Sequence, residues 1–354
     1  MMFKKWIGTS RFVYNRALKD TKNGEQMNFF SLRNKFVTKK NNTLVNDWEL
    51  ETPKDIRAEA IKDMTKAFNV AMINLKNNNI SKFNLNYRSK KKESSISIPA
   101  SAIKLSDKKI YMYTTYMKDP LKISKDKCIS NLKIEHTCRL KNDNGKWFLF
   151  VPVKTSFDNK LAEKEACSLD PGTRKFQTIY SEDSVLKIGI KKEVIEKIKN
   201  KIKNYQSLRS KKNIKKSKYN KKNNKIQFKL KNLVDELHYQ TISYLVKTFQ
   251  TIFIPKFESQ ELIKVNKSKK FRNDLLSLRH YTFKERLLEK SKSKKGCYVR
   301  VCTEEFTSKT CSACGNIDYN LKSKEIYECK NCNMVLDRDV NGARNIFIKN
   351  ILEI

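Results

Sequence analysis

Apolar residues recur at two different periods along this 354-residue chain. A period of three to four residues predicts amphipathic helices from Trp6 to about Leu18 and from Pro53 to Leu75, so that two or three helices occupy residues 1–80. From about Phe83 to Thr155, short runs alternate or cluster like strands. The chain therefore predicts a helical start followed by a small β-barrel or sheet.

Four short runs make up this β-region: Ser95–Ile98, Lys109–Tyr113, Ser130–Glu135 and Lys146–Val153. The segment Asn142-Asp-Asn-Gly145 lies between the last two runs and has the composition of a hairpin turn. We therefore expect an antiparallel strand pair around this turn. Basic and aromatic residues interleave at Tyr87–Lys90, which fits a nucleic-acid groove or a plain loop equally well.

The second half of the chain predicts alternating strands and helices. Residues 165–190 predict a three-strand meander, and a helix then continues to Val246. The later elements are a strand at Thr251–Ile254, a helix around Asp274–Lys290 and a strand at Cys297–Thr303. The predicted order is strand meander, helix, strand, helix, strand, cysteine-rich segment and final helix.

The chain is strongly basic, with 76 Lys and Arg against 37 Asp and Glu and a formal net charge of +39. A polyanionic partner would offset this self-repulsion. An AT-rich genome explains the preference for Lys over Arg, but it does not explain the shortage of acids. The basic residues are densest from Lys191 to Lys231, where seventeen accompany two acids in a predicted helical hairpin. This segment suits a helical arm on a phosphate backbone, with a solvated basic surface as the alternative.

Two Cys-x-x-Cys pairs, Cys311 with Cys314 and Cys329 with Cys332, are separated by fourteen residues. Their spacing matches a tetrahedral structural Zn²⁺ site, which leaves no position open for substrate. Two disulfides or unligated thiols are the alternative. The cysteine total is nine, an odd number, without a signal-peptide pattern, so we expect a reducing intracellular compartment. No run of eighteen apolar residues occurs, and we expect a soluble protein without a transmembrane helix.

Acidic residues stand at strand ends and at the start of the final helix of this basic chain. Asp170 closes the first strand of the meander directly before Pro171-Gly172, where an ordinary turn would have the same sequence. Asp339 opens the final helix, where aspartate also suits the N-cap. Together such carboxylates suggest a cage for two Mg²⁺ ions, which hydrolyse a phosphodiester by activating water and stabilising the leaving oxygen.

Five segments of the chain resemble the TnpB family and its relatives in eukaryotes and large viruses, the Fanzor proteins. They are Arg11-Phe-Val-Tyr-Asn-Arg-Ala-Leu18, Leu169-Asp-Pro-Gly-Thr173, Lys231-Asn-Leu-Val-Asp-Glu-Leu-His238, Thr307-Ser-Lys-Thr-Cys-Ser-Ala-Cys-Gly315 and Arg338-Asp-Val-Asn-Gly-Ala-Arg-Asn-Ile346. The similarity covers nearly the whole chain, and the motifs are specific in order and spacing. It implies an RNA-guided DNA endonuclease of a transposable element, similar to type V CRISPR effectors, in which base pairing reads the target.

The resemblance also implies a multidomain α+β fold. A RuvC-like nuclease domain with the RNase H-like α/β fold is interrupted by a zinc ribbon and preceded by a helical recognition domain and a small β-barrel wedge domain. The expected boundaries are 1–82 for recognition, 83–162 for the wedge, 163–306 for the first nuclease part with a basic hairpin at 191–246, 307–334 for the ribbon and 335–354 for the last nuclease part. Family members usually have a strand before the first helix, and we expect the barrel of this chain to lack it.

Residue by residue, the resemblance makes Asp170 the first catalytic carboxylate and Asp339 the third, with Asp337 as a weaker candidate. The second carboxylate departs from the pattern, because most TnpB proteins have a glutamate where this chain has Pro255. Fanzor-like members carry a glutamate just before the Thr-Ser-Lys-Thr-Cys motif instead. Glu304 matches that position, and Glu258 is the runner-up. The implied cofactors are a structural Zn²⁺ at the four cysteines and two catalytic Mg²⁺ at the three carboxylates.

The implied partners are a guide RNA derived from the mobile element and a double-stranded target DNA, bound by a protein monomer without membrane association. The residues expected to bind nucleic acid are Arg11, Tyr14, Asn15, Arg16, Lys211, Lys212, Lys215 and Lys216. Surface solvation is the alternative for any one of them. In a eukaryotic host we expect a nuclear location. Two other functions stay open: a protein that occupies DNA without cutting, and a strand-joining transposase, to which no residue points.

Overall fold

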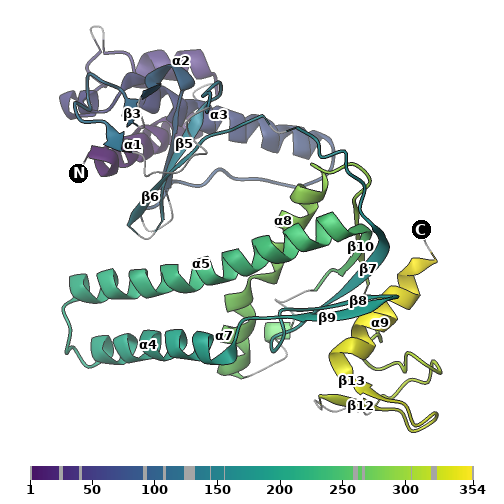
Figure 1. Cartoon of the computed structure of the whole chain (residues 1–354). Helices are drawn as coiled ribbons and strands as arrows, with labels where there is room; N and C mark the ends of the chain where they lie inside the picture. Colours follow the sequence, from purple (N-terminus) through teal and green to yellow (C-terminus); the bar gives the residue numbers. More distant parts are fainter. Residues whose placement is uncertain are drawn as a thin grey trace. The chain divides into compact units, whose positions relative to one another are not determined.

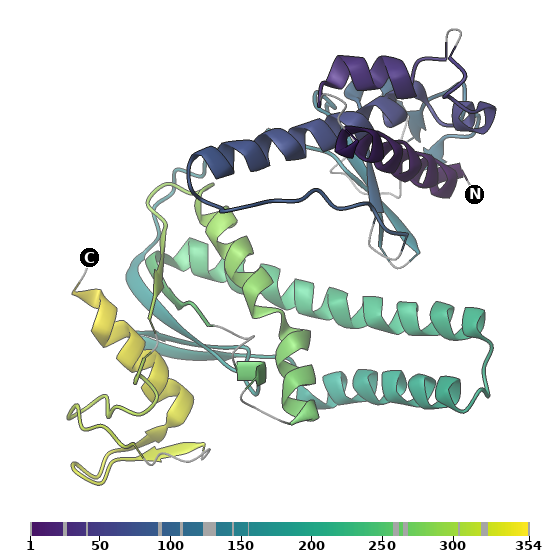
Figure 2. The ribbon, with the colours of Figure 1, turned by 180° about the vertical axis from the view of Figure 1, so that it is seen from behind.

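The structure is a computed structural model that describes residues 2–23, 27–39, 42–90, 94–106, 109–122, 132–143, 145–154, 156–257, 262–264, 268–303, 305–319 and 325–352. The chain forms two compact units, Met1–Lys154 and Thr155–Ile354. Figures 1 and 2 show the ribbon from opposite sides, coloured along the sequence. The first unit combines helices with two small sheets, and the second is built on one larger sheet.

The helices of the first unit are α1 (Met2–Lys22), α2 (Phe29–Phe36), the 3-10 helix η1 (Asp47–Glu51) and α3 (Lys54–Lys76). Apolar residues at helical spacing, among them Val13, Leu18 and Ile61, are buried together between them. The two predicted helices are confirmed. Helix α1 extends four residues beyond the predicted span at each end, because the flanking residues include lysines and other good helix formers.

The strands of the first unit form two antiparallel sheets, one of β1 (Ser94–Ile98), β5 (Cys138–Asp143) and β6 (Lys146–Phe150), the other of β2 (Ile103–Ser106), β3 (Lys109–Met112) and β4 (Leu121–Lys122). The place of the predicted hairpin turn is confirmed, with Asp143 paired to Lys146, but the strand before the turn is β5 and not the predicted Ser130–Glu135. The strand predicted at Ser130–Glu135 is wrong for residues 132–135, which are irregular, and its first two residues lie outside the described part. A closed barrel is not confirmed.

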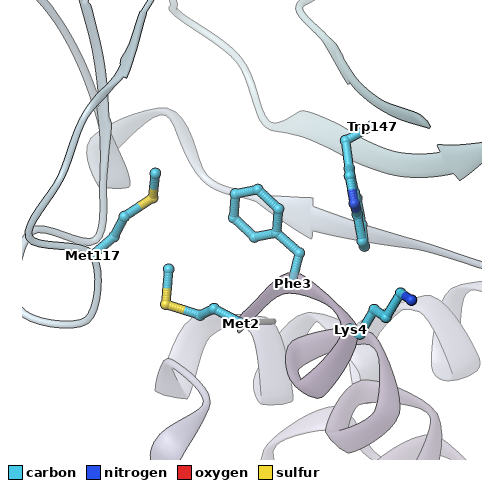
Figure 3. A pocket seen from close by; sticks show the side chains of 5 residues that line it. All are labelled: Met2, Phe3, Lys4, Met117 and Trp147. Atoms are coloured by element: carbon cyan, nitrogen blue, oxygen red, sulfur yellow. The ribbon is translucent and has the colours of Figure 1, made fainter. Parts of the chain in front are cut away.

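The first unit also contains a cavity of about 170 Å³ beside the start of α1 (Figure 3). Met2, Phe3, Met117 and Trp147 line it together with Lys4. This lining is apolar apart from one lysine and holds no carboxylate, histidine or thiol. It therefore supplies no carboxylate or thiol ligand for a metal, and the predicted ligands Asp170, Asp339 and the four paired cysteines belong to the second unit.

The sheet of the second unit has the strand order β11-β10-β7-β8-β9. Its strands are β7 (Lys164–Pro171), β8 (Gln177–Ser181), β9 (Ser184–Ile188), β10 (Phe249–Pro255) and β11 (Tyr298–Cys302). The first three in sequence form an antiparallel meander, and β10 and β11 then join parallel to β7 and to each other. In chain order the sheet is 3-2-1-4-5, the topology of the RNase H-like fold. The predicted meander and both later strands are confirmed.

The helices of this unit are α4 (Lys192–Ser210), α5 (Lys216–Thr248), α7 (Lys269–Leu278), α8 (His280–Ser291) and α9 (Arg338–Ile351). Helices α4 and α5 pack together as the predicted helical hairpin, which Figure 1 shows clearly. The single helix predicted around Asp274–Lys290 is instead two helices. Arg279 separates them with a left-handed backbone at φ 55°, a conformation that ends a helix.

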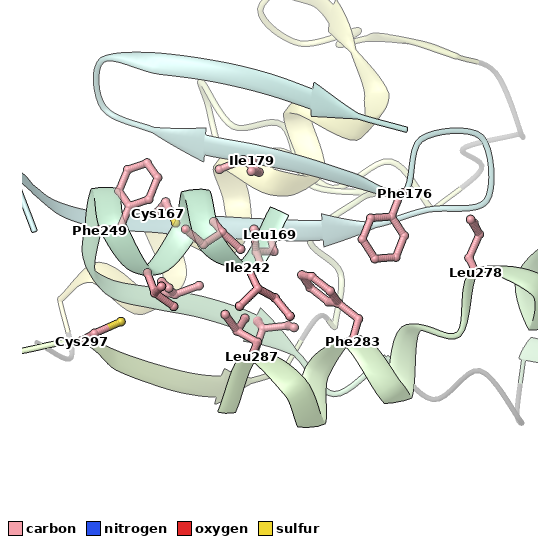
Figure 4. Packing of buried hydrophobic residues seen from close by; sticks show 14 residues of the cluster. Cys167, Leu169, Phe176, Ile179, Ile242, Phe249, Leu278, Phe283, Leu287 and Cys297 are labelled. Atoms are coloured by element: carbon pink, nitrogen blue, oxygen red, sulfur yellow. The ribbon is translucent and has the colours of Figure 1, made fainter. Parts of the chain in front are cut away.

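Strand β7 alternates between two faces of the sheet. Leu169 points to the face covered by α5 and α8, where it joins the buried cluster drawn in Figure 4. Ala166 and Ser168 point to the opposite face, which α9 covers. The Ser168 hydroxyl donates a buried hydrogen bond of 2.6 Å to the backbone carbonyl of Ala343 in α9. Because successive side chains of a strand point to opposite faces, Asp170 belongs to the α9 face.

The cysteine-rich segment between β11 and α9 contains a small antiparallel pair, β12 (Ile326–Glu328) and β13 (Val335–Asp337). The short strand predicted at Ile326–Cys329 is confirmed apart from its last residue. Strand β13 leads directly into α9, so the cysteine-rich segment and the last helix are continuous in structure. Within the described part of the chain, no helix is both long and apolar enough to span a membrane.

Candidate active site and cysteine cluster

The four cysteines of the two pairs converge. Their sulfur atoms all lie within 4.8 Å of one another, and the pairs Cys311–Cys332 and Cys314–Cys329 are each separated by 3.6 Å. Four sulfurs bound to one Zn²⁺ at about 2.3 Å lie about 3.8 Å apart. A disulfide would need about 2.05 Å. The arrangement fits a tetrahedral metal site.

Two buried asparagines of α9 fasten the cysteine-rich segment to this helix. The Asn341 amide donates to the carbonyl of Thr310 at 2.8 Å and accepts from the amide N–H of Ser312 at 3.0 Å. The Asn345 amide donates to the carbonyls of Thr307 and Thr310 at 2.8 and 2.7 Å. These contacts bind backbone groups on both sides of Cys311. The cysteine cluster and the start of α9 are therefore held together by these hydrogen bonds.

Asp170 lies at the carboxyl end of β7, against the first turns of α9. A Cβ atom built on Gly342 would come within 2.8 Å of the Asp170 Oδ2 atom. The carboxylate therefore occupies the space that a side chain at residue 342 would need. Asp339 lies three residues earlier on the same helix, and residues at that spacing are neighbours about 5–6 Å apart on a helix surface. The fold thus brings the first and third predicted carboxylates to one place.

The N-cap of α9 is Asp337, not Asp339. The Asp337 Oδ1 atom accepts from the amide N–H groups of Asp339 and Val340 at 3.0 and 3.2 Å, and its Oδ2 atom lies 2.5 Å from the Lys187 Nζ atom. The capping role that the sequence left open for Asp339 therefore belongs to its neighbour. Asp339 is the second residue of the helix and does not cap it.

The two aspartates have opposite pKa shifts. Burial, followed by the charge of Asp337, raises the pKa of Asp339. For Asp337 burial alone would raise the pKa, but hydrogen bonds from Lys187 and from two helix amides lower it overall. A raised carboxylate pKa marks a group whose charge is poorly compensated by the protein. A cation bound beside Asp339 would supply that compensation.

The strand ends place Pro255 beside Asp170. Phe253 of β10 pairs with Ser168 of β7, and two residues further along both parallel strands stand Pro255 and Asp170. Pro255 also pairs with Cys302, the last residue of β11. The position where most TnpB proteins carry a glutamate is therefore next to the first carboxylate and occupied by a residue without ligand atoms. Glu304 and Glu258, the candidates for the second carboxylate, lie outside the described residues.

The turn after Asp170 is held from the opposite side by a buried histidine. The His280 Nε2 atom hydrogen-bonds the carbonyl of Gly172 at 3.1 Å, and the rings of His280 and His238 stack on Phe176 with centroids 5.1 and 5.0 Å apart. Burial lowers the pKa of both histidines to about 4, so they are neutral at neutral pH. Both histidines are buried core residues. Their sequence neighbourhood held no sign of the contact with the Asp170 turn.

The predicted nucleic-acid residues of α1 have contacts inside the first unit. The Arg16 guanidinium donates to both carboxylate oxygens of Glu49 at 2.9 Å. Asn15 donates to the carbonyl of Arg88 and accepts from its amide N–H, and the Arg88 guanidinium stacks on the Tyr14 ring at 3.9 Å. These contacts stabilise the unit. Arg11 is partly exposed, and a role of these residues toward nucleic acid stays a prediction.

The predicted lysines of the hairpin lie at its tip. Lys211, Lys212, Lys215 and Lys216 are all exposed in or beside the connection between α4 and α5. The segment from Lys191 to Lys231 carries seventeen basic residues and two acids. Such a surface is strongly attractive to a phosphate backbone. Whether it meets RNA or DNA stays a prediction.

The chain is similar in sequence to several known proteins. A family model described as "Cas12f1-like, TNB domain" matches residues 280–346, from α8 through the cysteine cluster to α9. The chain is 27% identical to the putative transposase A625R of Paramecium bursaria Chlorella virus 1, with 99% of this chain and 83% of that protein covered. It is 34% identical to the TnpB-like protein L79 of Acanthamoeba polyphaga mimivirus over 59% of this chain. It spans only 42% of the length of that relative.

The structure resembles a solved structure described as a Cas12f1-sgRNA-target DNA complex. The two share 16% sequence identity and a TM-score of 0.51, with 97% of this chain and 81% of that chain covered. This similarity concerns the fold, a multidomain architecture with an RNase H-like domain and a cysteine ribbon. In sequence the chain is similar to TnpB-like proteins and, over residues 280–346, to the Cas12f1-like TNB domain. Its placement in the Fanzor subgroup stays a prediction.

Proposed function

We propose that this protein is an RNA-guided, Mg²⁺-dependent DNA endonuclease of a mobile element. The observation that carries the proposal is the position of Asp170 at the end of β7, against Gly342 and one helical turn from Asp339. Two carboxylates at the carboxyl end of an RNase H-like sheet, in a chain of net charge +39, suit hydrolysis of a polyanionic phosphodiester. No covalent nucleophile is required for this chemistry.

Asp170, Asp339 and Glu304 are the residues that we expect to hold Mg²⁺. The described part of the site fits the metal, because carboxylate oxygens are its preferred protein ligands and because the burial of Asp339 leaves its charge to be balanced. Bound Mg²⁺ supplies an activated water and charge stabilisation at the leaving oxygen. The protein contributes by fixing the two aspartates on rigid elements, a strand end tied to α9 by Ser168 and a helix capped by Asp337.

We assign Zn²⁺ to the four-cysteine cluster, in a structural role. The cluster offers four protein ligands, which complete a tetrahedral site and leave none for substrate. Through Asn341 and Asn345 it braces the helix that carries Asp339. The zinc ribbon therefore supports the active site without taking part in the reaction.

The partners that we propose are a guide RNA and a double-stranded DNA target. The chain shares its fold with a protein solved as a complex of Cas12f1 with an sgRNA and target DNA. The exposed lysines of the α4–α5 hairpin offer a binding surface for phosphates. Following the family resemblance, we assign recognition to residues 1–82, the wedge to 83–162, the nuclease to 163–306 and 335–354, and the zinc ribbon to 307–334.

The test is cleavage of a plasmid library with randomised flanking sequence. The protein is co-expressed with its native downstream RNA and assayed in Mg²⁺, beside the Asp170→Ala variant. Cutting that requires the RNA and disappears in the variant supports the proposal and identifies the flanking motif. Binding of the target without cutting would instead favour a protein that only occupies DNA. Cutting by protein free of nucleic acid would contradict the guided mechanism.

A further inference from the structure

A row of three polar side chains crosses the α9 face of the sheet beside the candidate metal site. The strand register pairs Asp170 of β7 with Thr178 of β8, and Thr178 with Lys187 of β9. Directly paired residues on neighbouring antiparallel strands project from the same face. With about 4.8 Å between neighbouring strands, the Lys187 backbone lies about 10 Å from that of Asp170. The side chains of Asp170, Thr178 and Lys187 therefore form a row across three neighbouring strands.

The ammonium group of Lys187 lies at the start of α9. Its Nζ atom is 2.5 Å from the Asp337 Oδ2 atom, and 32% of the side chain is exposed. Asp337 is the N-cap of α9 and precedes Asp339 by two residues. Lys187 is thus a cation that stands close to the predicted metal ligands and remains accessible to a ligand from outside.

The hydroxyl of Thr178 is a second and independent observation. The side chain is 1% exposed, and within the described part of the chain its Oγ1 atom has no hydrogen-bond partner. Buried hydroxyl groups in proteins are normally hydrogen-bonded. A hydroxyl left without a partner between a carboxylate and an ammonium group is suited to donate a hydrogen bond to a ligand oxygen.

Arg174 adds a cation in the turn that follows Asp170. Its guanidinium lies 3.0 Å from a Glu325 carboxylate oxygen and is 60% exposed. The Glu325 carbonyl in turn accepts from the amide N–H of Arg338, the residue before Asp339, at 2.8 Å. Arg174 is therefore linked through Glu325 to the start of α9.

We propose that Thr178 and Lys187, with Arg174 at the rim, form a binding subsite for a phosphate of the DNA strand that is being cut. The inference rests on the proposed function and adds the residues that hold the strand beside the metal ligands. A lysine binds phosphate as a point charge, without the geometric demands of a bidentate pair. On binding, Lys187 exchanges the Asp337 carboxylate for a phosphate oxygen, and its charge offsets the repulsion between the aspartates and the strand.

The chain offers a matched control lysine. Lys164 opens β7 at the opposite end from Asp170, six residues or about 20 Å away along the strand. Its Nζ atom lies 3.4 Å from Asp183 Oδ2, and 34% of its side chain is exposed. Lys164 and Lys187 therefore share residue type, exposure and an aspartate partner, and differ in their distance from the site.

The first arm of the test measures single-turnover cleavage of a guide-matched target by the protein–RNA complex. We expect Lys187→Met to slow cleavage by about tenfold, the factor that one charge-assisted hydrogen bond contributes, and Lys164→Met to leave it unchanged. Lys187→Arg should recover part of the rate. Asp337→Asn breaks the same ion pair while leaving the lysine in place. Equal losses in Asp337→Asn and Lys187→Met would show that the pair only supports α9 and would overturn the proposal.

The second arm does not require cleavage. Lysines are modified by reductive methylation in the absence of Mg²⁺, with and without a single-stranded thymidine oligonucleotide, and quantified by mass spectrometry. We expect the oligonucleotide to protect Lys187 and not Lys164. Equal modification of both lysines with and without DNA would overturn the subsite. Protection of Lys187 in a protein that does not cut would keep the subsite and overturn the nuclease.

Discussion

Two neighbouring residues of β7 show how the two faces of one sheet differ. Leu169 is fully buried in the apolar cluster under α5 and α8 (Figure 4). Asp170 points to the α9 face, where its carboxylate lies within 2.8 Å of the position of a Cβ on Gly342. The first face is mainly apolar, with the buried His238 and His280 hydrogen-bonded to backbone carbonyls at its edge. The second has an apolar cluster under α9 and, near the strand ends, also carries aspartates, a lysine and a hydroxyl.

The difference teaches that one strand can serve stability and chemistry at once. Burial of apolar side chains on the α5 and α8 face stabilises the sheet and makes its strand ends rigid. On the α9 face, by contrast, the burial of Asp339 opposes its charge. The apolar face therefore supports an arrangement of charges that would not hold together by itself.

The sharpest way to separate the two faces is to change the adjacent residues one at a time. We expect Asp170→Ala to abolish cleavage, a loss on the order of a thousandfold or more, because a metal ligand is removed, while the melting temperature stays nearly unchanged. Leu169→Ala should lower the free energy of unfolding by about 2–5 kcal/mol and leave the cleavage rate nearly normal below its melting temperature. Thermal melting and single-turnover cleavage check both. If Asp170→Ala and Leu169→Ala lowered the melting temperature equally, the two faces of the sheet would not differ in their contribution to stability.

The second carboxylate extends the comparison to residues outside the described part of the chain. We expect Glu304→Ala to abolish cleavage, again on the order of a thousandfold, and Glu258→Ala to leave it intact. The reason is that Glu304 follows β11, whose last residue pairs with Pro255, and Pro255 stands beside Asp170. Cleavage assays of the two variants decide between them. Loss of activity in Glu258→Ala alone would reverse the assignment.

The close approach between α9 and Asp170 predicts a smaller loss from a single methyl group. Gly342→Ala places a Cβ 2.8 Å from Asp170 Oδ2, so the carboxylate or the helix must move. A displacement of about 1 Å near reacting groups reduces the cleavage rate by about a hundredfold. The control is Gly189→Ala, whose new Cβ would have its closest contact at 3.7 Å. Similar cleavage rates for the two variants would show that the contact does not position Asp170.

The smallest expected effect concerns how the contributions of Asp339 and Asp337 to folding stability change with pH. The folded-state pKa of Asp339 is raised, so its contribution to stability is present at low pH and is lost as the pH rises through that pKa. The folded-state pKa of Asp337 is lowered, so its contribution is present at neutral pH and is lost as the pH falls through that pKa. Without Mg²⁺ at neutral pH, we therefore expect Asp339→Asn to raise the melting temperature and Asp337→Asn to lower it.

Melting curves of both variants between about pH 3 and pH 7 measure this difference, and the two should approach the wild type at low pH. The wild-type protein is the reference at every pH. If Asp339→Asn melted at a lower temperature than the wild type at neutral pH, burial would not be the cause of the raised pKa of Asp339.

Much of the site could be predicted from local sequence. The cysteine spacing indicated a metal site because ligand geometry is encoded within short turns, and the sulfurs do converge within 4.8 Å. The meander and the strands at Thr251–Ile254 and Cys297–Thr303 followed from their apolar runs. The prediction of a single helix around Asp274–Lys290 was wrong, because the left-handed backbone at Arg279 divides it into α7 and α8.

Some features had no local signal at all. The N-cap of α9 could have been Asp337 or Asp339 on composition, and only the backbone geometry at the helix start assigned it to Asp337. The contact of His280 with Gly172 joins residues 108 positions apart. The row of Asp170, Thr178 and Lys187 depends on the register of three strands, which a shift of one residue would reverse.

The sequence by itself determined the elements, their order, the cysteine ligands and the set of acidic candidates, because each depends on residues close together in the chain. Only the tertiary structure decided which of these residues meet. Asp170 and Gly342 are 172 positions apart, yet they touch because Ser168 fastens β7 to Ala343 of α9 across the buried face of the sheet. Such contacts follow from the packing of whole elements, where many weak interactions act together and no short segment specifies the outcome.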